Sequence, residues 1–137
     1  MKRILRTAVL STVLGVLALS TSIAIAAESN AAPLGSGDDF GIDMYASNIH
    51  DITGKSAYMW AYTEGEGSEL AKVRVYSYFY VNGKMEKADY ENGTRYASID
   101  YDASAKYLMD AKITSSHYAY NKAGDKVTRT SEKVYQN

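Results

Sequence analysis

The sequence predicts an all-β protein, a single antiparallel β-sandwich or small barrel of about six to seven strands. The main observation is that apolar and aromatic residues alternate with period two through most of the chain after residue 42, which is the pattern of strands. A second is that turn signals such as Asn-Gly separate these segments at intervals of about ten to twelve residues.

The strongest alternation lies in "VRVYSYFYV", residues 73–81, and in "SAYMWAY", residues 56–62. In 73–81, one face carries side chains suited to a dry core: Val73, Val75, Phe79 and Val81. The other face suits a partly wet surface, where phenol oxygens reach water: Arg74, Tyr76, Tyr78 and Tyr80. In 56–62, an aromatic row of Tyr58, Trp60 and Tyr62 opposes Ala57, Met59 and Ala61.

Two Asn-Gly pairs, Asn82-Gly83 and Asn92-Gly93, predict tight type I′ hairpin turns, because both central positions of that turn need a positive φ. A short strand over 84–90 would join them. Further strands are predicted over 42–49, 94–103, 107–120 and 126–135, with a turn at "NKAGD". A helix competes only over 103–112, where Tyr107, Leu108 and Ala111 share a helical face.

The first 26 residues predict a cleaved export signal. Lys2, Arg3 and Arg6 precede an uncharged apolar run that ends in Ala24-Ile25-Ala26, the small-x-small pattern of a cleavage site. The alternative is a membrane anchor, since the run approaches spanning length. The predicted organisation is therefore a signal peptide (1–26), a flexible lead-in (27–41) and one sandwich domain (42–137), secreted to the extracellular space.

The net charge and the absence of cysteine reduce the number of function classes that fit the chain. The signal holds three of the 15 basic residues and none of the 16 acidic ones, which leaves 12 against 16, a net charge of −4. Such a domain is a poor binder of nucleic acid or anionic lipid through bulk electrostatics, although a local patch is not excluded. The absence of cysteine excludes disulfides, a thiol nucleophile and lipid attachment through cysteine. We expect no nucleic-acid partner and no stable membrane insertion.

The aromatic residues are the candidate binding site. If the two segments pair as neighbouring strands, Tyr58, Trp60, Tyr62, Tyr76, Tyr78 and Tyr80 form one ladder. Such a ladder either stabilises an exposed sheet or recognises a ligand, since Tyr and Trp dominate binding hot spots and stack on flat groups. Burial of both faces is a third possibility.

No motif predicts catalysis, a metal or a cofactor. His50 and His117 lie in no nucleophile context, and a single histidine in a strand is typically a surface or hydrogen-bonded structural residue. "DYDAS" at 100–104 lacks the later residues of a calcium loop. The glycine-rich "EGEGSE" at 64–69 predicts a mobile acidic hairpin tip; the alternatives are a weak cation site or a contact with a basic partner. We therefore predict a protein that is not an enzyme; a small hydrolase with an unmarked site is the competing hypothesis.

Three stretches carry a family resemblance: "VLGVLALSTSIAIAA", "VYSYFYVNGK" and "YASIDYDASAKYLMDAKITSSHYAY". In these the chain resembles the lactococcin-type β-sandwich bacteriocins, over about residues 56–121. It departs from them in having a single tryptophan, Trp60, and in ending "VYQN". The resemblance implies a secreted effector that binds a cell-surface or cell-wall component of neighbouring bacteria. The alternative is an accessory or matrix module that binds carbohydrate or protein through the aromatic ladder.

Overall fold

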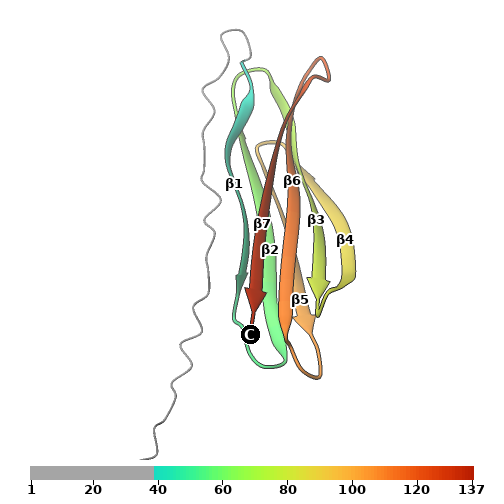
Figure 1. The fold of residues 1–137 in the computed structure, drawn as a ribbon. Helices are drawn as coiled ribbons and strands as arrows, with labels where there is room; N and C mark the ends of the chain where they lie inside the picture. Colours follow the sequence, from blue (N-terminus) through green and yellow to red (C-terminus); the bar gives the residue numbers. More distant parts are fainter. Residues whose placement is uncertain (1–38) are drawn as a thin grey trace, which may run out of the picture.

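The computed structural model describes residues 39–137, which form seven strands and, within that range, no helix (Figure 1). The strands are β1 (Gly41–His50), β2 (Ser56–Glu66), β3 (Leu70–Val81), β4 (Lys84–Gly93), β5 (Tyr96–Ser104), β6 (Asp110–Asn121) and β7 (Lys126–Gln136). The predicted export signal and most of the predicted lead-in lie outside the described residues.

All neighbouring strands are antiparallel, and they form two sheets. One has three strands in the order β1-β2-β5, and the other has four in the order β4-β3-β6-β7. Hairpins join β1 to β2, β3 to β4 and β6 to β7, whereas the chain changes sheet after β2, after β4 and after β5. The sheets pack face to face as a sandwich, which confirms the predicted fold class.

The inner faces of the two sheets form one core, to which β3 contributes every second side chain. Its alternate residues Val73, Val75 and Phe79 are fully buried, as the alternation predicts, and the Phe79 ring lies 5.4 Å from the Tyr101 ring of the opposite sheet. Met59, Leu108 and Ile113 are further large apolar side chains with almost no exposure. The Ala57/Met59/Ala61 side of β2 is inward, so the aromatic row of that strand faces outward.

The folded body begins before residue 42. Phe40 is buried in the core, and β1 starts at Gly41 opposite Glu66. The last residues of the predicted lead-in are therefore part of the sandwich. An isolated aromatic residue after a Gly- and Asp-rich stretch has no periodic neighbours, so alternation does not mark it as core.

The two Asn-Gly pairs have different structures. Asn82 has φ of 50° and Gly83 of 74°, which confirms the predicted tight turn between β3 and β4. The turn predicted at Asn92-Gly93 is wrong: both residues end β4, and neither has positive φ. Beyond them the chain crosses to β5 in the other sheet, and a Cβ on Gly93 would collide with the Tyr96 carbonyl oxygen. That glycine serves a close backbone approach.

Two other local expectations are also corrected. Residues 103–112 form no helix; β5 continues to Ser104, a loop follows, and β6 begins at Asp110. The "EGEGSE" segment is not the tip of a hairpin, because β2 and β3 do not pair. Its first three residues belong to β2, and the rest carries the chain across to the second sheet, where Lys122 Nζ lies 3.8 Å from Glu69 Oε1.

Candidate binding surfaces

The six predicted aromatic site residues do not form one ladder, because β2 and β3 belong to different sheets. Tyr58, Trp60 and Tyr62 lie on the outer face of the three-stranded sheet. Tyr76, Tyr78 and Tyr80 lie on the outer face of the four-stranded sheet. Alternation determines which way a side chain points but not which strand is the neighbour. The two aromatic rows therefore form two separate surfaces, where the sequence predicted one.

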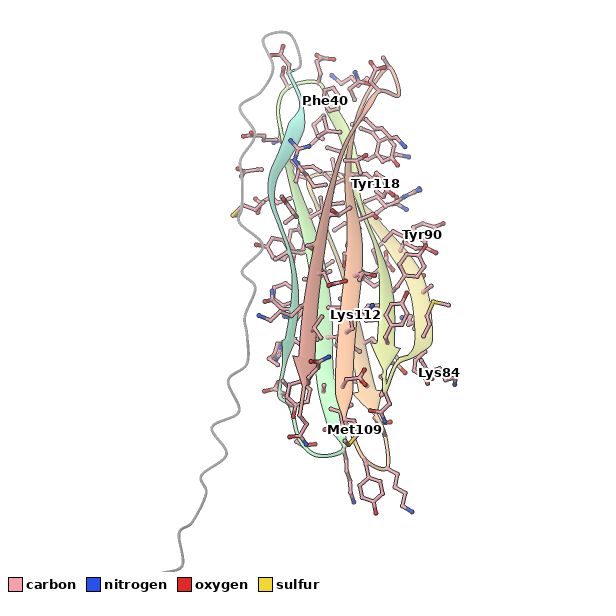
Figure 2. The ribbon with its side chains drawn as sticks, in the orientation of Figure 1. Phe40, Lys84, Tyr90, Met109, Lys112 and Tyr118 are labelled. Atoms are coloured by element: carbon pink, nitrogen blue, oxygen red, sulfur yellow. The ribbon has the colours of Figure 1, made fainter. Side chains whose placement is uncertain are left out.

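The surface on the four-stranded sheet, called the tyrosine face below, is the larger. It consists of Tyr76, Tyr78, Tyr80, Tyr90, Tyr118 and Tyr120. The Tyr76 ring lies 4.9 Å from Tyr78 in an edge-on arrangement and stacks on Tyr90 at 6.3 Å. Tyr118 and Tyr120 stack at 6.1 Å. Figure 2 shows Tyr90 on β4 and Tyr118 on β6.

Sequence reasoning missed Tyr90, Tyr118 and Tyr120 as members of this surface. The signal was present for the last two, because "HYAY" at 117–120 alternates and puts both tyrosines on one side. What the sequence did not contain was the pairing, which sets Arg74 opposite Tyr118, and Tyr76 opposite Tyr90.

Cationic side chains lie over these rings. Arg74 Cζ is 4.7 Å from the centroid of Tyr90, and Lys112 Nζ is 4.6 Å from that of Tyr80. Lys72 Nζ is 4.9 Å from the Tyr120 ring, and Lys126 Nζ is 5.6 Å from the Tyr118 ring. These distances are those of cation–π contacts. Arg74 Nε also donates to Asn92 Oδ1 over 2.8 Å, which fixes the plane of the guanidinium group.

The tyrosine face is locally basic although the predicted secreted chain is acidic. Its four cations share this outer face with Glu132 on β7 and Asp110 at the start of β6, and the edge strand β4 of the same sheet adds Glu86, Asp89 and Glu91. The hydrogen bond with Tyr78 and then partial desolvation raise the pKa of the Tyr76 hydroxyl above its usual value. The face therefore offers phenol groups between positively charged side chains.

The outer face of the three-stranded sheet has the opposite charge, and we call it the acidic face. Its aromatic members are Tyr58, Trp60, Tyr62 and Tyr96; Trp60 stacks on Tyr62 at 5.3 Å, and Tyr62 on Tyr96 at 6.0 Å. In the register, Asp102 is opposite Tyr58, and Asp100 is opposite Trp60. Partial burial and then these two carboxylates raise the pKa of the Tyr58 hydroxyl.

A polar network crosses the interior between the two sheets. Successive hydrogen bonds link six side chains in this order: Thr63, His117, Ser131, Ser47, Ser115 and Ser77. Thr63 Oγ1 is 2.8 Å from His117 Nδ1, and His117 Nε2 is 2.7 Å from Ser131 Oγ. His117 has no exposed surface, and its ring centroid is 5.0 Å from that of Tyr45. Within residues 39–137, no buried side-chain nitrogen or oxygen lacks a partner.

The donor and acceptor of the other bonds in the network follow from the bond between Ser47 and Ser115. The Ser47 hydroxyl donates to Ser115 Oγ over 2.8 Å. A hydroxyl carries one proton, so Ser131 is the donor in its 2.7 Å bond to Ser47, and Nε2–H of His117 is the donor to Ser131. Nδ1 is then an acceptor for the Thr63 hydroxyl, which also donates to the Arg74 carbonyl oxygen over 3.3 Å. Burial, opposed in part by the Tyr62 carbonyl, lowers the pKa of His117 to about 4, so the imidazole is neutral at neutral pH.

This network is a structural element, which confirms the expectation of a hydrogen-bonded histidine. Because His117 is fully buried, no substrate reaches its ring nitrogens. The other histidine, His50, is at the surface, where Nδ1 lies 2.9 Å from Asp51 Oδ2 and the ring packs on Tyr58. Among the described residues, no group of three or more His, Cys, Asp or Glu side chains is arranged to hold a metal ion. Residues 39–137 also include no helix that is long and apolar enough to cross a membrane.

Comparison with known proteins identifies no family. No protein-family model matches the chain, and no curated protein matches it. Among solved structures, a "putative beta-galactosidase from Bacteroides fragilis" superposes with a TM-score of 0.40 at 14% identity, over 66% of this chain and 15% of that one. A protein from Archaeoglobus fulgidus superposes with a TM-score of 0.35 at 8% identity, over 71% of this chain and 98% of that one. The chain is an antiparallel β-sandwich, a fold that hosts many functions.

Proposed function

We propose that the protein is an exported, non-catalytic binding protein that takes an anionic polymer of a cell surface or cell wall on its tyrosine face. The observation that carries the proposal is the set of four cations seated over tyrosine rings on one outer sheet face. The six rings and four cations come from β3, β4, β6 and β7 and span the width of one sheet.

Two properties of the face suit a polymer. Tyrosine presents a large flat surface with two side-chain torsions, and mutual stacking immobilises most of these rings before any ligand arrives. Sugar rings stack on such surfaces, while the phenol hydroxyls donate and accept hydrogen bonds. Because the face is an open sheet surface, a chain of repeating units can lie along it.

The charge of the face favours an anionic ligand. Arg74 presents a planar fork that matches carboxylate or phosphate groups, and Lys72, Lys112 and Lys126 add single positive charges around it. A net charge of −4 on the predicted secreted chain disfavours indiscriminate binding to polyanions. Selectivity then rests on combining the local charge with ring stacking.

A finer proposal is that the protein is an effector that acts on neighbouring bacteria by occupying a wall component; the sequence resemblance supports it. The alternative is an accessory or matrix module for carbohydrate or protein, and the acidic face supports that alternative, because Trp60 and Tyr62 form a second stacked aromatic surface.

The test is co-sedimentation of the purified protein with insoluble bacterial cell walls, with and without acidic polymers stripped from them, at low and at raised salt. The proposal predicts binding that weakens when the acidic polymers are removed and when salt is raised. Equal binding to both wall preparations would overturn the anionic ligand, and stronger retention on single-stranded DNA than on walls would indicate a nucleic-acid binder instead. Adding the protein to growing bacteria separates the two finer proposals, because only an effector inhibits growth.

A further inference from the structure

The acidic face, on the outside of the sheet formed by β1, β2 and β5, belongs to the half of the sandwich that carries the negative charge. No residue of these three strands is Lys or Arg, and their single basic side chain is the His50 imidazole. Residues 39–69 and 94–109, which comprise the strands and the adjoining loops, contain eight acidic residues and three lysines or arginines. Residues 70–93 and 110–137, which comprise the other sheet, contain six acidic residues and nine lysines or arginines. The two halves of the sandwich therefore carry net charges of opposite sign.

The carboxylates of the acidic face form no ion pair within residues 39–137. They are those of Glu64 on β2 and of Asp100 and Asp102 on β5, each directly opposite an aromatic residue of the face on the neighbouring strand. The salt bridges of the described residues all lie elsewhere. The basic side chains of this half are in the loops at the two ends of the sheet: Lys55, Arg95 and Lys106. The charge of the face is thus not neutralised by contacts inside the chain.

The aromatic rings of the acidic face also have no cation over them. On the tyrosine face, the chain's own Lys and Arg side chains lie over four of the six rings. Among the described residues, no such contact involves the four rings of the acidic face: Tyr58, Trp60, Tyr62 and Tyr96. Aromatic rings and carboxylates both attract cations. A surface that combines the two and supplies no cation of its own favours a cationic ligand.

The spacing of the carboxylates favours an extended chain over a single ion. Alternate residues of a strand are about 6.6 Å apart, and Asp100 and Asp102 are such a pair. The described residues contain no group of three acidic, histidine or cysteine side chains that could hold a metal ion. An extended peptide has the same interval between its alternate side chains. Basic residues at every second position of such a peptide would therefore meet successive carboxylates of the face.

We propose that the acidic face binds an extended basic segment of another protein, with arginine at alternate positions. Each guanidinium group pairs with the carboxylate of Asp100 or Asp102 and stacks on the aromatic ring opposite that carboxylate. A lysine ammonium provides neither the planar fork nor the planar stack. A second copy of this chain fits less well, because the cations of its tyrosine face already lie over their own rings. Binding here leaves the tyrosine face free and does not depend on the proposed function.

The only tryptophan of the chain, Trp60, lies on this face, so its fluorescence reports binding at the site. The protein, purified as its host cell processes it and with its N-terminus verified by mass, is titrated with three synthetic peptides of equal length. In these, Thr alternates with Arg, with Lys or with Glu, and calorimetry measures the same titrations independently. We expect the arginine peptide to change the Trp60 emission to saturation, the lysine peptide to bind more weakly and the glutamate peptide not to bind. Raised salt should weaken the binding.

Two double variants separate this site from general attraction between opposite charges. Asp100→Asn/Asp102→Asn removes two carboxylates of the acidic face, and Glu91→Gln/Glu132→Gln removes two exposed ones of the other sheet. Both change the net charge by the same amount, and melting temperatures are measured first to show that both variants fold. We expect the first to bind the arginine peptide about tenfold more weakly, because two ion pairs are lost, and the second to bind it as the parent protein does.

Several outcomes would overturn the inference: equal losses in the two double variants, equal affinity for the arginine peptide and either other peptide, no binding by the parent protein, or heat of binding without a change in Trp60 emission. Self-association of the parent protein that disappears in Asp100→Asn/Asp102→Asn would assign the face to a second copy instead. The same variant should still bind cell walls as the parent protein does, because it retains the tyrosine face. Failure of this inference is therefore distinguishable from failure of the proposed function.

Discussion

His117 Nε2 lies 2.7 Å from Ser131 Oγ inside the sandwich, and the imidazole donates its only proton to that hydroxyl. The bond joins β6 to β7, and the same network reaches β1 and β2 in the opposite sheet. A sandwich without disulfides thus has a chain of directed hydrogen bonds between its two layers. Each member is buried, so removing one leaves a partner without a bond and without water.

The first prediction concerns pH. The pKa of His117 is about 4 in the folded chain and about 6.5 when unfolded, so the unfolded state binds more protons between these values. Stability is fully present above about pH 6.5 and is lost as pH falls toward 4, by up to about 3 kcal/mol. Denaturant unfolding at a series of pH values measures this loss.

Titrating carboxylates also change stability in acid, so the control is His117→Gln. This variant is less stable at neutral pH, but its free energy of unfolding should change much less between pH 6.5 and pH 4.5 than that of the parent protein. Parallel curves for the two proteins would show that His117 is not buried in its neutral form.

The second prediction concerns Ser131. Ser131→Ala removes the hydroxyl between His117 and Ser47 and should lower the free energy of unfolding by about 1–3 kcal/mol, because two buried polar groups lose a partner. Thr128→Ala lies on the same strand but is exposed, and it should change stability by no more than about 0.5 kcal/mol. Equal effects in urea unfolding would contradict the network.

The third prediction isolates backbone conformation at the β3–β4 turn. A Cβ on Gly83 or on Gly54 meets no atom within 4 Å, but only Gly83 has a positive φ, of 74°. Gly83→Ala should therefore destabilise by about 1–2 kcal/mol, the cost of a left-handed conformation for a residue with a side chain. Gly54→Ala should be neutral or slightly stabilising. Thermal unfolding of both variants decides this, and a harmless Gly83→Ala would exclude the type I′ turn.

The fourth prediction separates the two faces of β3. Phe79 is fully buried, so Phe79→Ser leaves a cavity with a hydroxyl in it and should cost about 3–5 kcal/mol, comparable with Phe→Ala. Its neighbour Tyr78 points outward, and Tyr78→Ser removes mainly one ring contact, with Tyr76, for under about 1 kcal/mol. The melting temperatures of the two variants compare them. A larger loss for Tyr78→Ser would reverse the inside and outside of the sheet.

The local signals in the sequence predicted most of the strands but little of how the strands pair into sheets. Alternation through Val73–Val81 established the inner and outer side of β3, because side-chain direction in a strand depends only on parity. The same parity puts His117 with Ala111, Ile113 and Ala119 on the core side of β6, and this signal was available for the buried histidine.

Pairing between strands depends on contacts distant in sequence, so the sequence alone did not show which sheet holds each aromatic row. The Asn-Gly pairs illustrate the same limit. At Asn82 the following strand returns along β3 and requires positive φ, whereas at Asn92 the chain leaves for the other sheet. The two dipeptides have the same sequence, and the tertiary context selects the conformation of each.

Binding of the parent protein and two single variants to bacterial cell walls tests most directly whether the tyrosine face is the binding surface. Tyr78→Ser removes a ring from the tyrosine face, and Trp60→Ser removes one from the acidic face; both melting temperatures are measured first to show that the variants fold. The account predicts that Tyr78→Ser weakens binding by at least about 30-fold, the loss of a hot-spot aromatic residue of about 2 kcal/mol, while Trp60→Ser binds as the parent protein does. Full binding by folded Tyr78→Ser together with a loss in folded Trp60→Ser would contradict it.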